Sequence, residues 1–272
     1  MFVLSVSPIA FSLFGLHVYW YGILYSVAIF ASWFVATFVL KKLRINGVLV
    51  PTKEEFDRFM LFSIVYVLIG ARLGHVLFFD FEYYCCNPFE ILMIRNGGLS
   101  FHGAVLALSV YVYSFQKRCN FSWKIMTDIL SFSAALGLGI GRIANFINQE
   151  LYGKVTGSEN AVIFSFIDSL PRYPTQLFES FFEGFLNFWL LFIVFRIKGA
   201  MIIGTGKLTA LFCIIYSSAR FAIEFLKEVE THTYFDKFSL TTGQILSIAL
   251  LLFGLLVLQL KDEKIVNNRL YK

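Results

Sequence analysis

Three arginines lie inside long apolar stretches of this 272-residue sequence, at Arg72, Arg142 and Arg220. A charged side chain within a membrane-spanning segment costs at least about 2.5–3.5 kcal/mol and marks a functional site by default. A guanidinium stays protonated at any relevant pH, and its planar fork binds two phosphate oxygens at once. Each arginine lies nearer the end of its stretch that we assign to the outer side. We therefore expect the three side chains to converge on a phosphate that carries acyl chains.

Each arginine also has a structural alternative, in which it snorkels to the interface or pairs with an acid. Arg220 is followed four residues later by Glu224, which is the spacing of a local ion pair on a helix. Arg142 has no acid within one helical turn, and the nearest polar residue on its face is Asn145. A structural role therefore explains Arg142 least well, whereas both interpretations stay open for Arg72 and Arg220.

A histidine, His102, stands between glycines at the outer entry to an apolar stretch, in the segment 97–103. An imidazole takes up a proton near neutral pH, so His102 is a candidate general base, although a lone histidine is more often a core residue. The neighbouring Ser100 does not make this a serine hydrolase, because the sequence has no GxSxG elbow and no orienting acid nearby. Neither the four cysteines nor the four histidines have the spacing of a metal site, so we expect no metal.

Polar residues cluster at two further places, the helix end at 142–154 and the segment 172–179 that leads back into an apolar stretch. Thr175 in the second segment fits a helix cap. That does not explain why Gln176, Glu179 and Glu183 all enter an apolar span. In the first helix, Gly137 and Gly141 have the spacing that lets a neighbouring helix approach closely.

The composition places these residues in a membrane protein. Hydrophobic residues make up 58% of the chain and charged residues 15%, against roughly 25% charged in a soluble domain, and the mean hydropathy is +0.71. High hydrophobicity with low charge also excludes a disordered chain. The net charge of +5 does not indicate a nucleic-acid partner, because the basic residues separate apolar runs and form no stripe.

Seven apolar stretches are long enough to cross a bilayer, which takes about 20 residues. They lie at about 16–40, 59–79, 99–115, 125–147, 176–195, 208–226 and 240–260. The first stretch precedes Lys41, Lys42 and Arg44 and has no basic residue before it, as expected of a retained helix and not of a cleaved signal peptide. Under this assignment fifteen Lys and Arg residues lie on the inner side and five on the outer side. The positive-inside rule then puts the N-terminus outside and the C-terminus in the cytoplasm.

We therefore predict an all-α integral membrane protein of about seven transmembrane helices. The whole chain, residues 1–272, forms a single polytopic membrane domain. The longest outer connection, at about 148–174, is expected to form a small extracytoplasmic cap.

Seven short blocks of this sequence, spread in one order along nearly the whole chain, resemble those of a known enzyme family. They are Trp20-Tyr21-Gly22, Gly70–Gly74, Gly97–Gly103, Gly141–Asn148 with Glu150, Arg172–Glu179, Arg220–Glu224 and Gly243-Gln244. By these blocks the sequence is identified as a member of the phosphatidylglycerol–prolipoprotein diacylglyceryl transferases, the first enzymes of bacterial lipoprotein maturation. It departs from the family's usual residues mainly in the cap and rim, at Gln149, Tyr152, Lys154, Tyr173 and Val229-Glu230.

The resemblance implies a reaction between phosphatidylglycerol and a prolipoprotein signal peptide in the bacterial plasma (inner) membrane. The lipobox cysteine thiol takes the diacylglyceryl group as a thioether, glycerol phosphate leaves, and no cofactor takes part. By resemblance His102 is the base, while Arg142 and Arg220 stabilise the departing phosphate. Tyr21, Asn145 and Glu150 would orient the headgroup, and Glu224 would fix Arg220 by pairing with it. Gly153 and Arg72 complete the implied substrate site.

A transporter of lipids or small anions is the competing function class, since it would use the same arginines only to bind. Such transporters often carry internal pseudo-symmetry and broken helices in corresponding halves, and we find neither in the sequence. A structural membrane scaffold ranks third, because it would not need costly buried arginines.

Overall fold

The computed structural model describes residues 2–45, 50–78, 80–93, 98, 100–119, 121–228 and 240–260, without the side chains of residues 78, 101, 102 and 242. The chain forms two compact units. The first comprises the described residues of Met1–Lys42 and Thr127–Lys264, and the second those of Leu43–Met126. Each unit is described by itself below.

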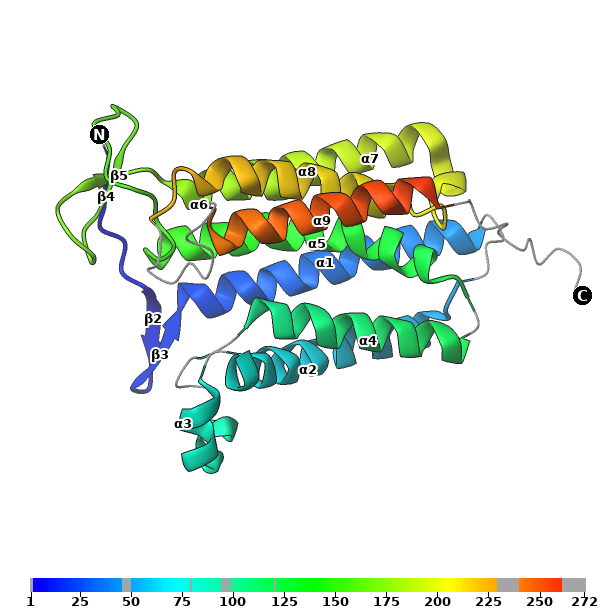
Figure 1. Cartoon of the computed structure of the whole chain (residues 1–272), viewed down its shortest axis with the longest axis horizontal. Coiled ribbons are helices and arrows are strands. Elements are labelled where there is room, and N and C mark those ends of the chain that lie inside the picture. The colour runs from blue at the N-terminus through cyan, green and yellow to red at the C-terminus, as the bar shows by residue number, and fades with distance from the viewer. Residues whose placement is uncertain are drawn as a thin grey trace, which may run out of the picture. The chain divides into compact units, whose positions relative to one another are not determined.

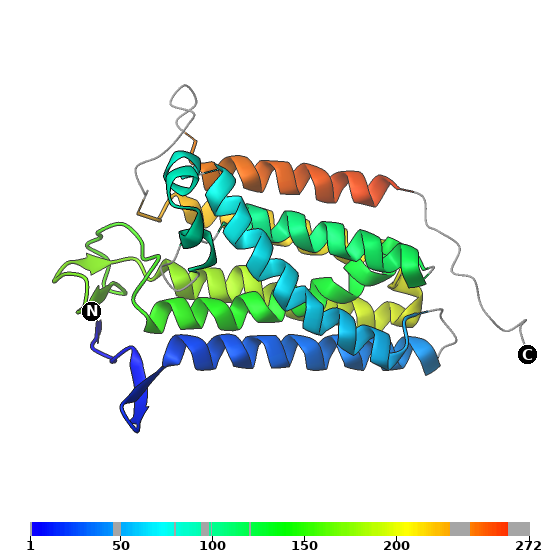
Figure 2. The ribbon, with the colours of Figure 1, turned by 90° about the horizontal axis from the view of Figure 1, so that it is seen from below.

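The first unit consists mainly of helices that run lengthwise beside one another (Figures 1 and 2). Its helices are α1 (Trp20–Ile45, up to Lys42), α5 (Trp123–Ile147, from Thr127), α6 (Thr175–Glu179), the π-helical segment η3 (Ser180–Leu186), α7 (Asn187–Lys198), the 3-10 turn η4 (Gly199–Ile202), α8 (Lys207–Glu224) and α9 (Thr242–Gln259). Its strands are β1 (Phe2–Leu4), β2 (Ile9–Leu13), β3 (Leu16–Tyr19), β4 (Val162–Phe164) and β5 (Pro171–Arg172).

The second unit is built on two paired helices. Its elements are α2 (Lys53–Phe78), α3 (Phe81–Cys86), the 3-10 helix η1 (Pro88–Leu92) and α4 (Phe101–Cys119). Helices α2 and α4 cross closely at Gly74, where an added Cβ would lie 2.6 Å from the Cα of Gly103. Only glycines allow this approach of the two backbones.

The described residues are mostly helical, and their apolar surface fits a lipid environment. By length and composition, four helical stretches can cross a membrane, at Trp20–Ile45, Lys53–Leu77, Trp123–Ile147 and Thr175–Ile202, and a shorter apolar helix lies at Gly243–Gln259. Large apolar side chains on α1 stay exposed, such as Phe30 at 70% and Phe34 at 74%. So much exposed apolar surface is unfavourable in water and favourable in hydrocarbon.

All seven stretches predicted from the sequence contain a helix, and the fifth combines α6, η3 and α7. The predicted start of the first helix is wrong by four residues. Leu16–Tyr19 forms strand β3, which pairs with β2 as an antiparallel hairpin, and the helix begins at Trp20. Phe14 and Gly15 turn this hairpin with φ angles of 49° and 82°, so the apolar run continues through a tight turn that hydropathy alone does not reveal.

The connection at 148–174 folds into a small sheet, which the prediction of an all-α chain did not include. Strand β4 lies between β1, to which it is parallel, and β5, to which it is antiparallel. Leu4, Val162 and Phe164 form the core of this sheet, and Phe146 and Tyr152 pack against it. The pairing joins residues about 160 positions apart, because Phe2 faces Val162, and sequence patterning does not show such distant partners.

Helix α5 is held tightly on two sides within the first unit. The predicted close approach at Gly137 is confirmed, since an added Cβ would lie 2.8 Å from Oγ of Ser32 on α1. Gly141 faces Tyr25 with ordinary room, at 3.8 Å. The hydroxyls of Ser32 and Ser133 donate to each other's backbone carbonyls at 2.8 and 3.0 Å, which fixes α1 against α5.

A closer contact than that at Gly137 occurs at Gly139, between the two glycines named from the sequence. An added Cβ on Gly184 of η3 would lie 2.5 Å from the Gly139 nitrogen. Ser180 also donates its hydroxyl to the Gly139 carbonyl at 2.7 Å. These contacts bring the acidic residues of α6 and η3 against the last turns of α5.

Candidate active site

A single buried carboxylate, that of Glu179 at the end of α6, binds three cations in the first unit. Arg142 lies with Nε 3.3 Å from Oε2 of Glu179. Arg220 pairs through Nη1 with the other oxygen, Oε1, to which Nζ of Lys227 also donates at 3.0 Å. Arg142 and Arg220 thus come from α5 and α8 and lie on opposite oxygens of one carboxylate.

Each arginine has a second acidic partner. Nη2 of Arg142 lies 3.5 Å from Oε2 of Glu183, which η3 presents one turn beyond Glu179. Nη2 of Arg220 lies 2.9 Å from Oε2 of Glu224, so the local pair predicted from the i,i+4 spacing is confirmed. The side chains form a row of alternating charge, in the order Glu183, Arg142, Glu179, Arg220 and Glu224.

Two guanidiniums face three carboxylates in this row, and Lys227, which also binds Glu179, makes the formal charges equal. Burying a charge away from water costs several kcal/mol unless a partner compensates it, and each arginine of the row lies between two carboxylates. The side chains of Arg142 and Arg220 remain 16% and 18% exposed, whereas Glu179 and Glu183 are fully buried. Glu179 and Glu183 therefore anchor the two guanidiniums on their buried side, and the exposed part of the row consists of Arg142, Arg220 and, at 11%, Glu224.

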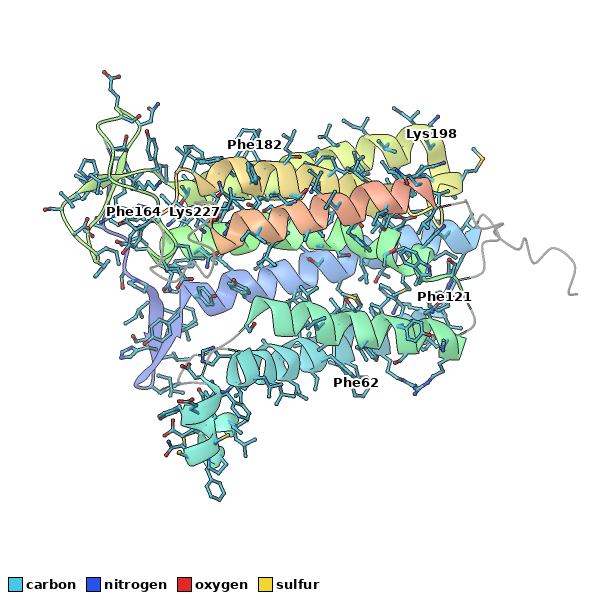
Figure 3. All side chains as sticks on the ribbon, viewed as in Figure 1. Phe62, Phe121, Phe164, Phe182, Lys198 and Lys227 are labelled. Carbon is cyan, nitrogen blue, oxygen red and sulfur yellow. The ribbon has the colours of Figure 1, made fainter. Side chains whose placement is uncertain are left out.

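Lys227, three residues after the end of α8, adds a third cation. Burial lowers the pKa of Lys227, and the charge of Glu179 opposes this shift. Figure 3 shows Lys227 beside the strand end of the unit and Lys198 at the far end of α7. In the sequence Lys227 counted only as an outer loop residue.

A second polar group forms where α5 ends. Asn145 donates its amide to Oε1 of Glu150 at 2.5 Å, and Asn148 donates to Oε2 at 3.0 Å. The chain reverses through Gln149 and Leu151, whose φ angles are 57° and 56°. This reversal returns Glu150 to the helix end, so the structure brings together Asn145 and Glu150, two of the candidate site residues.

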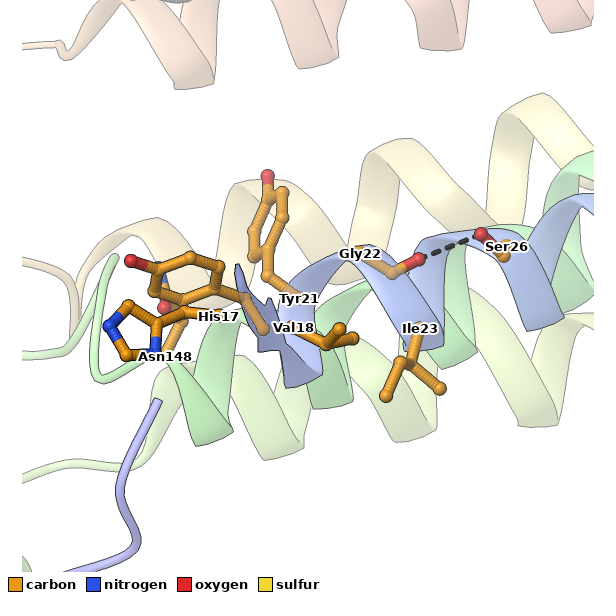
Figure 4. Close-up of a pocket in the computed structure, with 8 residues that line it drawn as sticks. His17, Val18, Tyr21, Gly22, Ile23, Ser26 and Asn148 are labelled. Atoms are coloured by element: carbon orange, nitrogen blue, oxygen red, sulfur yellow. Dashed lines mark hydrogen bonds between the residues drawn. The ribbon is translucent and has the colours of Figure 1, made fainter. Parts of the chain in front are cut away.

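An open groove of about 730 Å³ lies beside this group (Figure 4). It is lined by His17, Val18, Tyr19, Tyr21, Gly22, Ile23, Ser26 and Asn148. Tyr21 stands in the groove with its ring centroid 4.5 Å from that of Tyr25. Because Asn148 both lines the groove and binds Glu150, the groove leads directly to the polar group at the end of α5.

Gly153 lies where three segments meet. An added Cβ would lie 2.7 Å from both the Leu226 carbonyl oxygen and the Tyr173 Cβ. The Gly153 nitrogen donates to the Tyr173 carbonyl at 2.9 Å, and Gly153 forms an antiparallel bridge with Lys227. Only a glycine lets the segment that carries Lys227 approach the cap this closely.

Arg172 ties the cap to the segment after α8. Its guanidinium binds Asp168 at 2.7 Å and Glu228 at 2.6 Å, and it lies over the Tyr152 ring at 4.7 Å. The hydrogen bonds from Arg172 lower the pKa of the Asp168 carboxyl below its ordinary value. The sequence prediction assigned no role to this arginine.

The other two predicted site residues, Arg72 and His102, belong to the second unit. Arg72 is buried and donates to four backbone carbonyls after α2, and its guanidinium lies over the Tyr84 ring at 5.0 Å. The acceptors are Glu90 at 2.5 Å, Ile91 at 2.9 Å, Gly98 at 3.2 Å and Met93 at 3.3 Å. His102 belongs to the first turn of α4, and its side chain lies outside the described part of the chain.

Sequence reasoning missed Glu179, Glu183 and Lys227 as members of the site. The signal for the two glutamates was present, because both enter an apolar span with no local explanation. In the part of the chain that the structure describes, no three His, Cys, Asp or Glu side chains gather as a metal site requires.

Comparison with known proteins decides the family. The model of the family described as "Prolipoprotein diacylglyceryl transferase" matches residues 8–260. The chain belongs to this family. The prolipoprotein diacylglyceryl transferase fold therefore carries the charge row at Glu179 and the polar group at Glu150.

Individual relatives match over a similar length of the chain. A protein of Rickettsia felis (strain ATCC VR-1525 / URRWXCal2) is 38% identical over 251 residues, which cover 92% of this chain and 95% of the relative. A protein of Rickettsia bellii (strain OSU 85-389) is 40% identical over 252 residues, covering 92% and 94%. Both are named phosphatidylglycerol–prolipoprotein diacylglyceryl transferase, so this member of the transferase family matches its relatives over nearly all of their length.

Proposed function

We propose that this chain transfers the diacylglyceryl group of phosphatidylglycerol to the lipobox cysteine of a prolipoprotein signal peptide. The product is a thioether, and glycerol phosphate leaves. Family membership supports the reaction. The observation that carries it is the placement of Arg142 and Arg220 on one buried carboxylate, with both guanidinium side chains still partly exposed and able to meet a phosphate.

The reaction needs positive charge at the leaving group. The thiolate sulfur forms a bond to the glycerol carbon, the bond from that carbon to the phosphate oxygen breaks, and the phosphate gains one negative charge. Fixed donors in a site of low dielectric stabilise such charge by several kcal/mol. Glu179 and Glu183 lie at Nε and Nη2 of Arg142, and Glu179 and Glu224 lie at the two Nη atoms of Arg220. The third nitrogen of each guanidinium is the proposed phosphate donor.

The polar group at the end of α5 suits the glycerol headgroup. Glycerol offers hydroxyls that donate to a carboxylate and accept from an amide. Asn145 and Glu150 provide these two functions side by side, and Tyr21 stands in the adjoining groove. We assign headgroup orientation to these three residues.

The remaining site residues have supporting roles in this proposal. Glu224 fixes Arg220, and Gly153 allows the segment of Lys227 to approach the cap. His102 is the proposed base, because a free thiol has a pKa near 8.5 and reacts as the thiolate. For Arg72 the four carbonyl acceptors support the structural alternative over headgroup binding.

The proposed topology is one polytopic domain in the bacterial plasma (inner) membrane. It has seven crossings, the N-terminus outside, the C-terminus in the cytoplasm and residues 148–174 as the extracytoplasmic cap. Basic residues at the ends of two helices support the orientation, since cytoplasmic ends are rich in Lys and Arg. Lys41, Lys42 and Arg44 close α1, and Arg196 and Lys198 close α7.

A mass measurement tests the function directly. Purified protein in detergent is incubated with phosphatidylglycerol and a peptide that contains a lipobox cysteine. We expect the peptide to gain the mass of one diacylglyceryl unit, and a peptide with serine in place of the cysteine to gain none. Lipid movement in vesicles without any change in peptide mass would instead support a transporter.

A further inference from the structure

A second buried carboxylate, that of Asp128, joins α5 to the beginning of α8. Its Oδ2 accepts the backbone N–H groups of Gly204 at 2.9 Å and Gly206 at 3.0 Å. Its Oδ1 accepts the backbone N–H of Thr209 at 2.9 Å and the Thr209 hydroxyl at 2.8 Å. Asp128 is fully buried, so these four hydrogen bonds replace the water that a carboxylate otherwise requires.

Helix α8 depends on this carboxylate for its N-terminal end. The first N–H groups of a helix have no partner within the helix and favour a negative charge. The residue that caps α8, Gly206, offers no side chain, and its φ of 80° is left-handed. Asp128, on α5, therefore accepts the hydrogen bonds that a capping side chain of α8 would otherwise accept.

The same two helices are joined a second time at the charge row, through Glu179 of α6. Arg142 follows Asp128 by fourteen residues on α5, and Arg220 follows Thr209 by eleven residues on α8. At 1.5 Å per residue these spans measure about 21 Å and about 16.5 Å. Both arginines bind Glu179, so α5 and α8 run in the same direction and are joined at two levels.

The junction that Asp128 makes between α5 and α8 is important because the helices lie in lipid. Apolar side chains give little preference for one axial position of a helix over another in a bilayer, so hydrogen bonds and close packing fix helix positions there. Without Asp128, α8 has fewer contacts that resist sliding along α5. A slide carries Arg220 away from the oxygen of Glu179, and a displacement of 1 Å in a catalytic group can lower the rate about 10²-fold.

We propose that Asp128 is a positioning residue for the transfer reaction. It fixes the axial position of α8 against α5 and so places Arg220 beside Arg142. This inference rests on the proposed function, in which the two arginines act together on one phosphate. Asp128 itself touches no substrate and acts through Arg220.

The test is a double-mutant cycle on the transfer assay with phosphatidylglycerol and a lipobox peptide. Asp128→Asn keeps the side chain's size but turns an amide group toward backbone N–H donors. Arg220→Lys keeps the cation but loses the planar fork. We expect Asp128→Asn to lower kcat about 10²-fold in the native background and only a few-fold in the Arg220→Lys background. A loss of folded protein lowers kcat by the same factor in both backgrounds.

Equal factors in the two backgrounds, or full activity of Asp128→Asn, would overturn the proposal. Thr209→Val is the matched control, because it removes one hydroxyl and leaves the three backbone donors of Asp128; it should retain most of the wild-type kcat. If Asp128→Asn does not fold, Asp128→Glu enters the same cycle. It keeps the negative charge, but its side chain is longer by one methylene and so displaces the beginning of α8. Failure of the wild-type protein to modify the peptide would contradict the proposed function instead.

Discussion

Arg142 and Arg220 are 78 residues apart in the sequence and bind opposite oxygens of the same buried carboxylate, Glu179. Two guanidiniums that bind one carboxylate are close enough to repel each other, and the negative charge between them offsets this repulsion. Glu179 supplies that anion permanently, so the two guanidiniums are assembled before a lipid arrives. A site arranged in advance does not have to reorganise as charge develops on the leaving phosphate.

The first prediction concerns the arginine with the most buried partners. Arg142→Ala should abolish thioether formation, because one of the two cations at the leaving phosphate is lost. Removing one such donor typically costs about 10²–10³-fold in kcat. Mass spectrometry of a lipobox peptide in detergent measures the transfer, and membrane fractionation checks that the protein is still inserted.

Lys198→Ala is the matched control, since it removes a cation at the far end of α7 (Figure 3). It should leave transfer unchanged. Transfer by Arg142→Ala near the wild-type rate would remove Arg142 from the phosphate site.

A second prediction compares two buried glutamates on one helical stretch. Glu179→Gln removes the anion shared by three cations, whereas Glu183→Gln removes a partner of Arg142 alone. Breaking a buried ion pair costs about 3–5 kcal/mol, so Glu179→Gln should lower the unfolding temperature and the transfer rate more than Glu183→Gln does. Thermal unfolding in detergent and the transfer assay measure both. Equal losses would show that Glu179 is not the centre of the row.

The sequence predicts the parts of this site that are local along the chain and misses those that are not. The pair of Arg220 and Glu224 follows from i,i+4 spacing alone. The partners of Arg142 come from a different helix, 37 and 41 residues later. Without a structure Arg142 therefore looked unpaired. The pairing of β1 with β4 was hidden for the same reason.

Arg72 illustrates a different limit of the sequence. Its position within an apolar span is compatible with both a functional and a structural role. Only the path of the surrounding backbone distinguishes these two roles. The carbonyls that accept its hydrogen bonds belong to residues 90–98, which have no pattern that marks them as guanidinium acceptors. Chain path, and not residue type, decides what this arginine binds.

A third prediction follows for Arg72. In Arg72→Lys, the lysine ammonium has only three N–H donors, and its side chain differs in shape from that of arginine. The variant therefore cannot maintain hydrogen bonds to all four carbonyls. We expect a lower unfolding temperature, with the KM for phosphatidylglycerol unchanged in the protein that remains folded. Calorimetry and initial-rate kinetics measure the two quantities. A raised KM at an unchanged unfolding temperature would instead place Arg72 at the headgroup.

The fourth prediction concerns His102 as the base. If an imidazole takes the thiol proton, the rate falls as the pH drops through the range near 6.5 where imidazoles protonate. His102→Gln cannot be protonated there, so it should lower the rate and lose this acidic limb. Transfer rates between pH 5 and pH 9, on the same peptide, measure the profile. An unchanged rate and profile would remove His102 from the reaction.

The last prediction concerns the acid sensitivity of the cap. Arg172 lowers the pKa of Asp168 in the folded protein, while an unfolded aspartate titrates near 3.9. A lowered folded-state pKa adds stability that is fully present above about pH 4. This contribution is lost as the pH falls through the folded-state value, because the proton then occupies the carboxylate that Arg172 binds. Asp168→Asn should therefore remove part of the cap's stability at neutral pH and make a smaller difference at pH 2. Limited proteolysis of the cap, followed by mass spectrometry at both pH values with an acid-active protease at the lower one, measures this. The Arg172 interaction with Asp168 does not stabilise the cap if the variant and the wild type are cleaved equally at neutral pH.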